Sequence, residues 1–266
     1  MICRFDCVDY WKPGVLMNTE SHQRRWPGDV GSILFVLLSW QILAWIIHQP
    51  YLPSPLAVIY AMGDFGFLYK MGSHLLYSLG RVSCGIAIAI LIGVPIGYLM
   101  GYTNKVDRLL SPLVYFTYPI PKLALLPIVM LLFGFGELSK LTMIVLIVIF
   151  QLIISARDAV RGIPAEIFRS VRSLGANRWQ LFQEIIIPAT MGEILTSSRL
   201  GLGTALSVLF FTETYGTVFG MGYFIMDAWM RHNYLEMYGG IVLLSFMGFL
   251  LFRLIDLLEN KVCAWR

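Results

Sequence analysis

The chain has 266 residues, of which 58% are hydrophobic and only 14% are charged, and its mean hydropathy is +0.72. Soluble domains carry about 25% charged residues, so this chain lacks the polar groups needed to cover a water-facing surface. The composition excludes a soluble domain and predicts a polytopic membrane protein. The apolar runs are continuous rather than alternating, which favours an all-α fold over a transmembrane barrel.

Six apolar stretches approach the roughly 20 residues that a helix needs to cross a bilayer. In chain order they are residues 32–48, 79–100, 109–133, 138–155, 194–211 and 238–252. The second has five small residues spaced four apart, which places them on one helix face and predicts close packing against another helix. These are Gly85, Ala89, Gly93, Gly97 and Gly101. We expect this packing to lie within the chain, with a homodimer contact as the alternative.

Lys and Arg are distributed unevenly between the connections, and this asymmetry sets the orientation. With both termini inside, the cytoplasmic segments hold 14 of these residues and the outer segments hold only Lys70, Lys140 and Arg231. The bias accounts for the net charge of +4 without a nucleic-acid partner. It predicts a cytoplasmic tail at residues 1–31, a transmembrane domain at 32–258 and a second cytoplasmic tail at 259–266.

The third stretch is interrupted by prolines and has Lys122 in its middle. Proline-broken spans are typical of transport paths, whereas the alternative is a kinked structural helix. Charged groups inside spans are functional candidates, and Glu213 either lines a path, locks a gate or snorkels to the interface. For Arg81 and Arg199 we expect snorkelling. The candidate path residues are Pro119, Pro121, Lys122, Thr212 and Glu213.

The long inner connection, residues 156–193, predicts a basic amphipathic helix–turn–helix. Pro164 suits the first turn of a helix, and Gly175 suits its end because glycine takes positive φ readily. Asn177 is expected to cap the second helix, and Pro188 to end it. Such a segment either lines the membrane surface or docks on a soluble partner.

This inner loop resembles that of the permease subunits of binding-protein-dependent ABC importers. Their loop has Glu-Ala-Ala, a glycine after three residues, nine further residues and then Ile-x-Leu-Pro. Gly175, Ile185, Ile187 and Pro188 match this spacing, whereas Arg169-Ser170-Val171 replaces Glu-Ala-Ala. Ala176 and Trp179 look like the nitrate/sulfonate/bicarbonate/taurine branch. The resemblance also covers Ser78-Leu79-Gly80-Arg81, residues 119–127, Phe133-Gly134-Phe135-Gly136-Glu137, Glu213 and Gly220-Met221-Gly222-Tyr223.

The resemblance implies the fold of a type I ABC importer permease and an ATPase-coupling role for the inner loop. The residues implied are Glu166, Arg169, Ser170, Ser173, Leu174, Gly175, Ala176, Asn177 and Arg178. No G-x-x-x-x-G-K-[ST] stretch is present, so ATP and Mg²⁺ are expected on a separate ATPase subunit and no cofactor or metal on this chain.

The implied assembly contains ABC ATPase subunits, an extracytoplasmic solute-binding protein and two permeases, expected as a homodimer in the inner membrane of a bacterium or archaeon. The expected solute is a sulfonate, taurine, nitrate or a similar anion, although the branch also handles pyrimidine precursors of thiamine. The alternative function is a proton-coupled secondary transporter, for which Lys122 and Glu213 are the available titratable pair. An integral-membrane enzyme is disfavoured because the four histidines are scattered.

Overall fold

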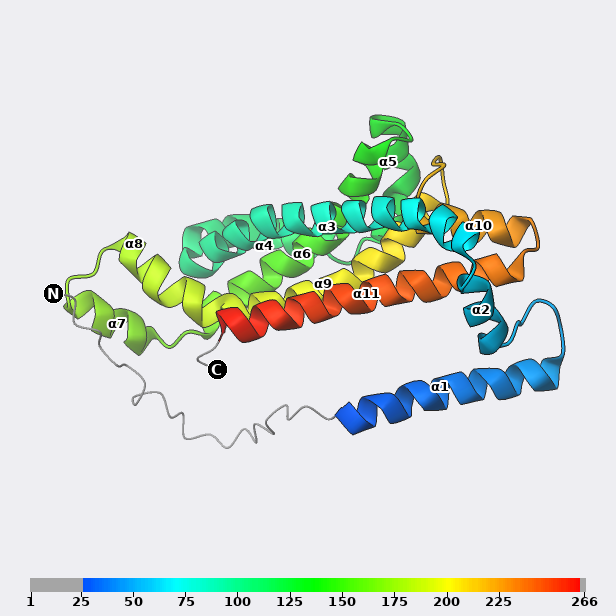
Figure 1. Cartoon of the computed structure of the whole chain (residues 1–266). Helices are drawn as coiled ribbons and strands as arrows, with labels where there is room; N and C mark the ends of the chain where they lie inside the picture. The colour runs from blue at the N-terminus through cyan, green and yellow to red at the C-terminus, as the bar shows by residue number, and fades with distance from the viewer. Residues whose placement is uncertain (1–25, 264–266) are drawn as a thin grey trace. The chain divides into compact units, whose positions relative to one another are not determined.

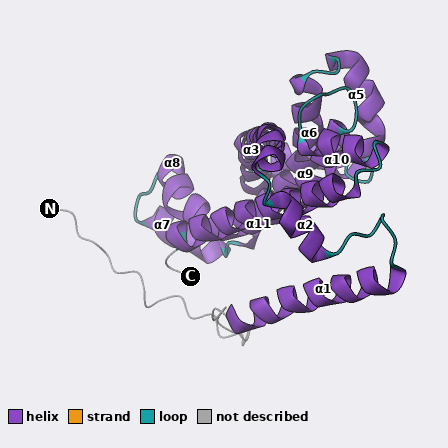
Figure 2. Ribbon diagram, turned by 45° about the vertical axis from the view of Figure 1, so that its right-hand side comes forward, coloured by secondary structure: helices purple, strands orange, loops and turns teal. Residues whose placement is uncertain are grey.

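The structure is a computed structural model that describes residues 26–263, and over these residues it consists of helices and loops without strands (Figure 2). The chain divides into two compact units, Met1–Ile47 and His48–Arg266. In the first unit, helix α1 (Trp26–Ile47) contains the first predicted apolar stretch almost entirely. The predicted N-terminal tail lies mostly outside the described residues.

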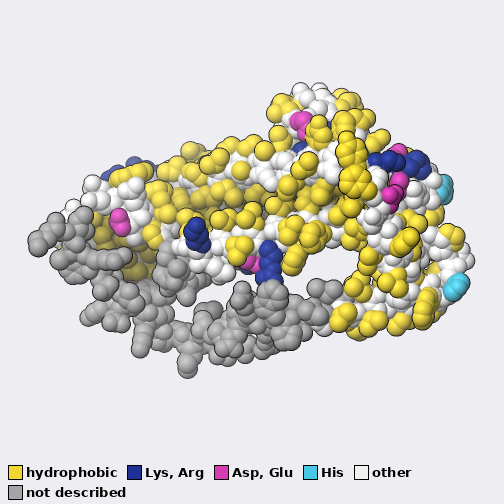
Figure 3. All heavy atoms as spheres, viewed as in Figure 1, with side chains coloured by type: hydrophobic (Ala, Val, Ile, Leu, Met, Phe, Trp, Pro, Cys, Tyr) yellow, Lys and Arg dark blue, Asp and Glu magenta, His cyan; other side chains and the backbone are white. Residues whose placement is uncertain are grey.

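The second unit contains four helices that are long and apolar enough to cross a membrane. They are α3 (Phe65–Tyr102), α6 (Glu137–Gly162), the continuous helix Arg178–Glu213 and α11 (Tyr234–Val262). Hydrophobic side chains make up most of the visible helix surface, as expected where lipid is the solvent (Figure 3). The all-α membrane fold is therefore confirmed.

The third predicted span is not one continuous helix. It is broken into α4 (Asn104–Thr117) and a second arm made of the 3-10 turn η1 (Lys122–Leu125) and α5 (Leu126–Phe133), which meet at 84°. Pro119 and Pro121 lack the N–H groups that would continue α4, and each restricts the residue before it. In Figures 1 and 2, α5 projects away from the neighbouring long helices of its unit.

The small-residue face of α3 packs against α6. A Cβ added to Gly97 would lie 2.6 Å from the Cβ of Ala156, and one added to Gly101 would lie 2.6 Å from the Cβ of Val160. Distances this short leave no room for another side chain. The prediction of packing within the chain is confirmed, and the alternative of a homodimer contact through this face is wrong.

The prediction that the second inner-loop helix ends at Pro188 is wrong. Helix α8 (Arg178–Leu181) continues through a π-helical turn, η2 (Phe182–Ile186), directly into α9 (Ile187–Glu213). Pro188 therefore lies inside a continuous helix, directly after a π-helical turn, which is a local adjustment that accommodates the missing N–H of a proline. The continuous helix has 36 residues and is roughly 54 Å long at 1.5 Å per residue.

Short helices lie at both ends of the second unit. Helix α7 (Ala165–Ser173) and α8 lie at one end, and α2 (Pro55–Met62) and α10 (Met221–Met230) lie at the other (Figure 1). Ser54 caps α2 by accepting a hydrogen bond from the N–H of Ala57, and Asp64 caps α3 through Gly66. The outer segment before residue 79, predicted as a connection, is thus largely helical.

Candidate functional site

The turn between α7 and α8 has the hydrogen-bond pattern of a Schellman motif. The N–H of Gly175 donates to the carbonyl of Arg172 at 2.9 Å, and the N–H of Ala176 donates to the carbonyl of Val171 at 3.4 Å. Gly175 has φ +87°, the left-handed conformation that this motif requires. The predicted helix end at Gly175 is confirmed.

Asn177 caps α8 as predicted, and it does so reciprocally with Gln180. Its side-chain oxygen accepts from the N–H of Gln180 at 2.9 Å, while the side chain of Gln180 accepts from the N–H of Asn177 at 2.8 Å. These two bonds satisfy donors that a helix of only four residues would otherwise leave to solvent. The turn is therefore a well-defined surface feature with a fixed backbone.

The nine residues, Glu166 to Arg178, for which the resemblance implies an ATPase-coupling role are accessible around this turn. We call them the coupling surface. Eight of the nine are exposed and Ala176 is half-buried. Leu174 is 86% exposed, which is unusual for a leucine outside a lipid-facing surface. Trp179 is 63% exposed and stacks on Phe182 at 5.8 Å between ring centroids. Its side chain extends the apolar part of the coupling surface.

Aromatic and aliphatic side chains anchor the coupling surface to the long helices. Phe168 of α7 and Phe182 of η2 pack on a buried cluster that includes Ile186 and Val160. Tyr98 of α3 makes an edge-to-face contact with Phe182 and shares a 2.8 Å hydrogen bond with Thr190. A displacement of the turn would therefore be transmitted to α3 and α9.

At the opposite end of α9, three charged residues and a serine from three helices form a network: Ser78, Arg81, Glu137 and Glu213. We call it the outer clasp, after the orientation that the Lys and Arg bias predicts. Arg81 donates to Glu213 at 2.7 Å and makes a bidentate pair with Glu137. Ser78 donates to both oxygens of the Glu213 carboxylate at 2.8 Å. Arg81 and Glu213 have side-chain exposures of 3% and 0%. Snorkelling was thus the wrong expectation for Arg81.

Backbone groups complete the outer clasp and tie it to α10. The N–H of Gly222 donates to Glu213 at 2.9 Å, and the N–H of Met221 donates to Ser78 at 2.8 Å. Gly220 has φ +129°, and a Cβ there would collide with the Glu213 carboxylate. The conformation and the close approach both require glycine. Thr212 and Glu213 are fully buried, so in this conformation a solute does not reach them.

The candidate path residues include only Glu213 of the clasp, so the predictions missed Ser78 and Glu137 and assigned Arg81 to snorkelling. Both belong to stretches that resemble the permease family, Ser78-Leu79-Gly80-Arg81 and Phe133-Gly134-Phe135-Gly136-Glu137. These motifs could have indicated both residues as candidates. Only the tertiary structure, however, shows that α3, α6 and α9 bring them together. Arg199, also expected to snorkel, instead pairs with Asp256 and Glu259 of α11 and stays partly exposed.

Lys122 lies at the break between α4 and α5, far from the clasp. Its ammonium donates to the carbonyl of Tyr118 at 2.8 Å and lies 5.3 Å from the ring centroid of Phe150 in α6. Phe150 follows Glu137 by thirteen residues on that helix, which is about 20 Å of rise. Lys122 and Glu213 are therefore not a coupled pair, and the requirement of the secondary-transporter alternative is not met. Pro119 and Pro121 are exposed beside Lys122.

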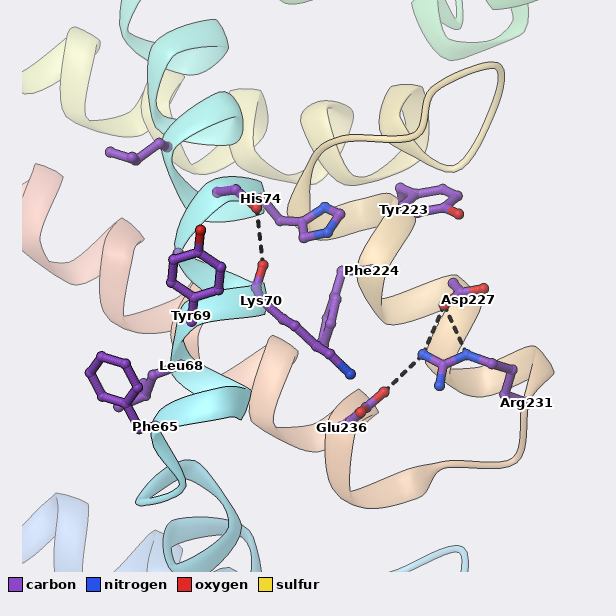
Figure 4. Close-up of a pocket in the computed structure, with 13 residues that line it drawn as sticks. Phe65, Leu68, Tyr69, Lys70, His74, Tyr223, Phe224, Asp227, Arg231 and Glu236 are labelled. Atoms are coloured by element: carbon purple, nitrogen blue, oxygen red, sulfur yellow. Dashed lines mark hydrogen bonds and ion pairs between the residues drawn. The ribbon is translucent and has the colours of Figure 1, made fainter.

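A cavity of about 930 Å³ opens at the end of the unit where α10 lies. Figure 4 shows Arg231 held by Asp227 and Glu236, while Lys70 extends between Phe224 and Glu236 with its ammonium directed into the pocket. The hydrogen bonds that Arg231 donates to Glu236 and Asp227 raise its pKa above the ordinary value. We call this the outer pocket.

Comparisons with known proteins agree with this geometry. Residues 85–262 match the family described as "Binding-protein-dependent transport system inner membrane component". The taurine transport system permease protein TauC of Escherichia coli (strain K12) is 31% identical, over 94% of this chain and 98% of that protein. The formylaminopyrimidine transport permease protein ThiX of Halalkalibacterium halodurans is 30% identical, over 88% of this chain and 93% of that protein.

The fold is similar to that of a solved structure described as inward-facing conformations of the MetNI methionine ABC transporter. The TM-score is 0.64 at 16% identity, covering 75% of this chain and 99% of the other. At that identity the likeness concerns the fold alone. The long apolar helices, the family match and the full-length relatives together identify the chain as a member of the binding-protein-dependent transport system inner membrane component family, a multi-pass permease subunit of an ABC importer.

Proposed function

We propose that two copies of this permease form a path for a small anion such as a sulfonate, driven by two separate ATPase subunits and supplied by an extracytoplasmic solute-binding protein. Lys122 carries the proposal. It is a cation beside a break in the helix, partly exposed, on a face that this chain alone leaves open.

The depth of Lys122 argues against contact with lipid. Its ring partner Phe150 lies at the middle of the 26-residue helix α6, so the ammonium belongs near the bilayer midplane. Insertion scales give a cost of about 2.5–3.5 kcal/mol for a lysine at that depth. The irregular backbone between Thr117 and Lys122 adds polar groups that hydrocarbon cannot satisfy.

A second copy of the chain is the simplest way to remove this face from lipid. Exposed apolar side chains surround the break, among them Phe116, Leu131 and Leu132. Two such faces in contact would shield the broken backbone and leave a polar passage between the two Lys122 side chains. In the proposed homodimer Lys122 therefore faces water rather than lipid, and its positive charge can attract anions.

The ATPase subunits would bind the coupling surface at the opposite end from the outer pocket. Leu174 and Trp179 supply apolar contacts there, and the exposed Arg169 and Arg178 supply charge. In this proposal ATP and Mg²⁺ stay on the ATPase, and its closure moves the turn around Gly175. The continuous helix from Arg178 then carries the motion to the outer clasp at Glu213, which acts as the outer gate.

The outer pocket is our proposed docking place for the solute-binding protein. Its mixed charges (Lys70, Asp227, Arg231 and Glu236) offer partners of both signs to a soluble protein surface. This assignment uses the orientation from the Lys and Arg bias, in which both termini and the coupling surface are cytoplasmic. The membrane is then the cytoplasmic membrane of a bacterium or archaeon.

The chemical identity of the solute is the most specific part of the proposal. The name of the relative TauC points to taurine, an aminosulfonate, and the name of ThiX points to a pyrimidine. A lysine in the path favours the solute that carries an anionic group. We therefore propose a sulfonate, with nitrate and similar anions as members of the same chemical class.

Uptake into proteoliposomes that contain the permease, its ATPase and its solute-binding protein tests this. We expect ATP-dependent taurine uptake, reduced about tenfold by Lys122→Gln and largely restored by Lys122→Arg, which keeps the positive charge. Lys105→Gln, which removes an exposed inner lysine outside the path, is the matched control and should transport normally. Equal uptake of taurine by all variants, or transport of formylaminopyrimidine alone, would contradict the anion path.

A further inference from the structure

A cavity of about 410 Å³ lies where α7 meets the ends of α3 and α6. Its lining combines three guanidinium groups, from Arg161, Arg169 and Arg172, with an apolar wall. The wall is made by Gly101, Val160, Ile163, Ala165 and Phe168, and Tyr102 adds a hydroxyl. A basic rim beside an apolar wall matches the two parts of an anionic lipid, the phosphate and the first carbons of its chains.

One face of α7 builds this cavity. Ala165, Phe168, Arg169 and Arg172 follow the spacing i, i+3, i+4, i+7, which brings their side chains to the same side of a helix. The ring centroids of Phe168 and Tyr102 lie 6.3 Å apart, so this face of α7 packs against the end of α3. Arg169 is shared with the coupling surface described above, whose other residues lie on the remaining side of α7 and at the turn around Gly175.

The charges of the cavity are not balanced. Arg161 pairs with Asp107 at 2.6 Å, and Arg169 pairs with Glu166 at 3.4 Å on a highly exposed edge. Arg172 donates to the hydroxyl of Tyr102 at 3.0 Å, and within residues 26–263 no carboxylate forms an ion pair with it. Its guanidinium is thus held at the cavity with donors left for a further acceptor.

We propose that this cavity binds the phosphate of an anionic phospholipid from the cytoplasmic leaflet, with Arg172 as the principal contact. The ends of α3 and α6 place the cavity at the boundary of the apolar region, where lipid headgroups lie. Basic pockets between membrane helices on the cytoplasmic side are suited to such headgroups. The bound lipid would hold α7 against the membrane and so set the position of the coupling surface, independently of which solute is transported.

The test is lipid retention by the permease–ATPase complex in nanodiscs of phosphatidylethanolamine with phosphatidylglycerol, measured by native mass spectrometry. We expect the wild type to retain phosphatidylglycerol preferentially, and Arg172→Gln to lower that preference about fivefold. Tyr102→Phe, which only releases the Arg172 side chain, should lower it less. Arg108→Gln is the matched control, because Arg108 is an exposed inner arginine outside the cavity.

Three results would overturn the proposal. Equal preference in the wild type, Arg172→Gln and Arg108→Gln would show that the cavity does not select the lipid. Binding of soluble glycerol phosphate to the detergent-purified complex, lost in Arg172→Gln, would assign the site to a free phosphate ester. A preference seen for the isolated permease but absent with the ATPase bound would show that the ATPase occupies the cavity.

Discussion

Arg81 and Glu213 form an ion pair between α3 and α9 that is almost completely withdrawn from solvent. A buried pair costs desolvation energy, and its attraction offsets that cost only when further hydrogen bonds satisfy both groups. Here Ser78, Glu137 and the N–H of Gly222 supply those bonds. The network holds α3, α6 and α9 together in one arrangement, and loss of Arg81 or Glu213 leaves a buried charge without its partner.

This leads to a prediction for the residue pair. Glu213→Gln and Arg81→Gln should each destabilise the protein by about 3–5 kcal/mol, because each leaves an uncompensated buried charge. The double variant should be less destabilised than the sum of the two. Thermal denaturation of the detergent-purified permease measures all three. Strict additivity would show that the two side chains do not interact.

Arg199 provides the control for that experiment. It too pairs with carboxylates of another helix, Asp256 and Glu259, but its side chain is 31% exposed. Water screens such a pair, so Arg199→Gln should cost only about 0–1 kcal/mol. A loss as large as that of Arg81→Gln would mean that exposure does not govern the strength of these pairs.

At the scale of the element, the helix from Arg178 to Glu213 connects the coupling surface to the outer clasp without interruption. The π-helical turn at Phe182–Ile186 carries it past Pro188, and Phe182 and Ile186 fix that turn to the core. A rigid helix of this length moves as one piece. A displacement at the Gly175 turn therefore has a direct mechanical route to Glu213.

The Gly175 turn gives the prediction for this element. Gly175→Trp should insert and fold, because within residues 26–263 no atom other than those of Gly175 and its two neighbours lies within 4 Å of a Cβ at that position. Its uptake should fall strongly, and its ATPase should either bind weakly or bind without driving transport. Its indole would occupy the surface where we propose that the ATPase docks. Uptake assays paired with ATPase pull-down measure both effects.

Two variants separate bulk from backbone strain. Gly175→Ala adds only the left-handed strain of about 1–2 kcal/mol, so it should retain most of its uptake. Gly162→Trp adds the same bulk on the inner side but outside the coupling surface, and it should bind the ATPase normally. If Gly175→Trp transports at the wild-type rate with its ATPase bound, the coupling role of this turn is excluded.

For the whole molecule, the structure groups the connections at two opposite ends of the second unit, α7 and α8 at one and α2 and α10 at the other (Figure 1). On a background without native cysteines, an impermeant thiol reagent added outside should label cysteine at Asp64 or Asn233. It should not label cysteine at Asn104 or Asn177 until the membrane is opened. External labelling at Asn177 would reverse the orientation and remove the proposed ATPase contact.

Much of this fold follows from the sequence alone because lipid imposes a simple rule. Backbone groups must be satisfied within each span, so continuous apolar runs become helices, and the Lys and Arg bias indicates their direction. The local signals at Gly175 and Asn177 were also sufficient, since a helix end depends on the φ angle and side chain of one or two residues. The stripe of small residues on α3 likewise predicted a close helix contact.

Other features depend on partners distant in sequence, which a local pattern does not contain. Arg81 near a span end reads as a snorkelling residue until Glu137 and Glu213 are brought to it by the packing of α3, α6 and α9. The continuation past Pro188 rests on a π-helical turn stabilised by the core. The prolines of the third stretch predicted an interruption, but only the structure shows that its two arms meet at 84°. The sequence by itself determined the helices, the family and the helix end at Gly175. Only the tertiary structure decided which charges are buried and paired, because the free energy of a buried charge depends on the groups around it in space.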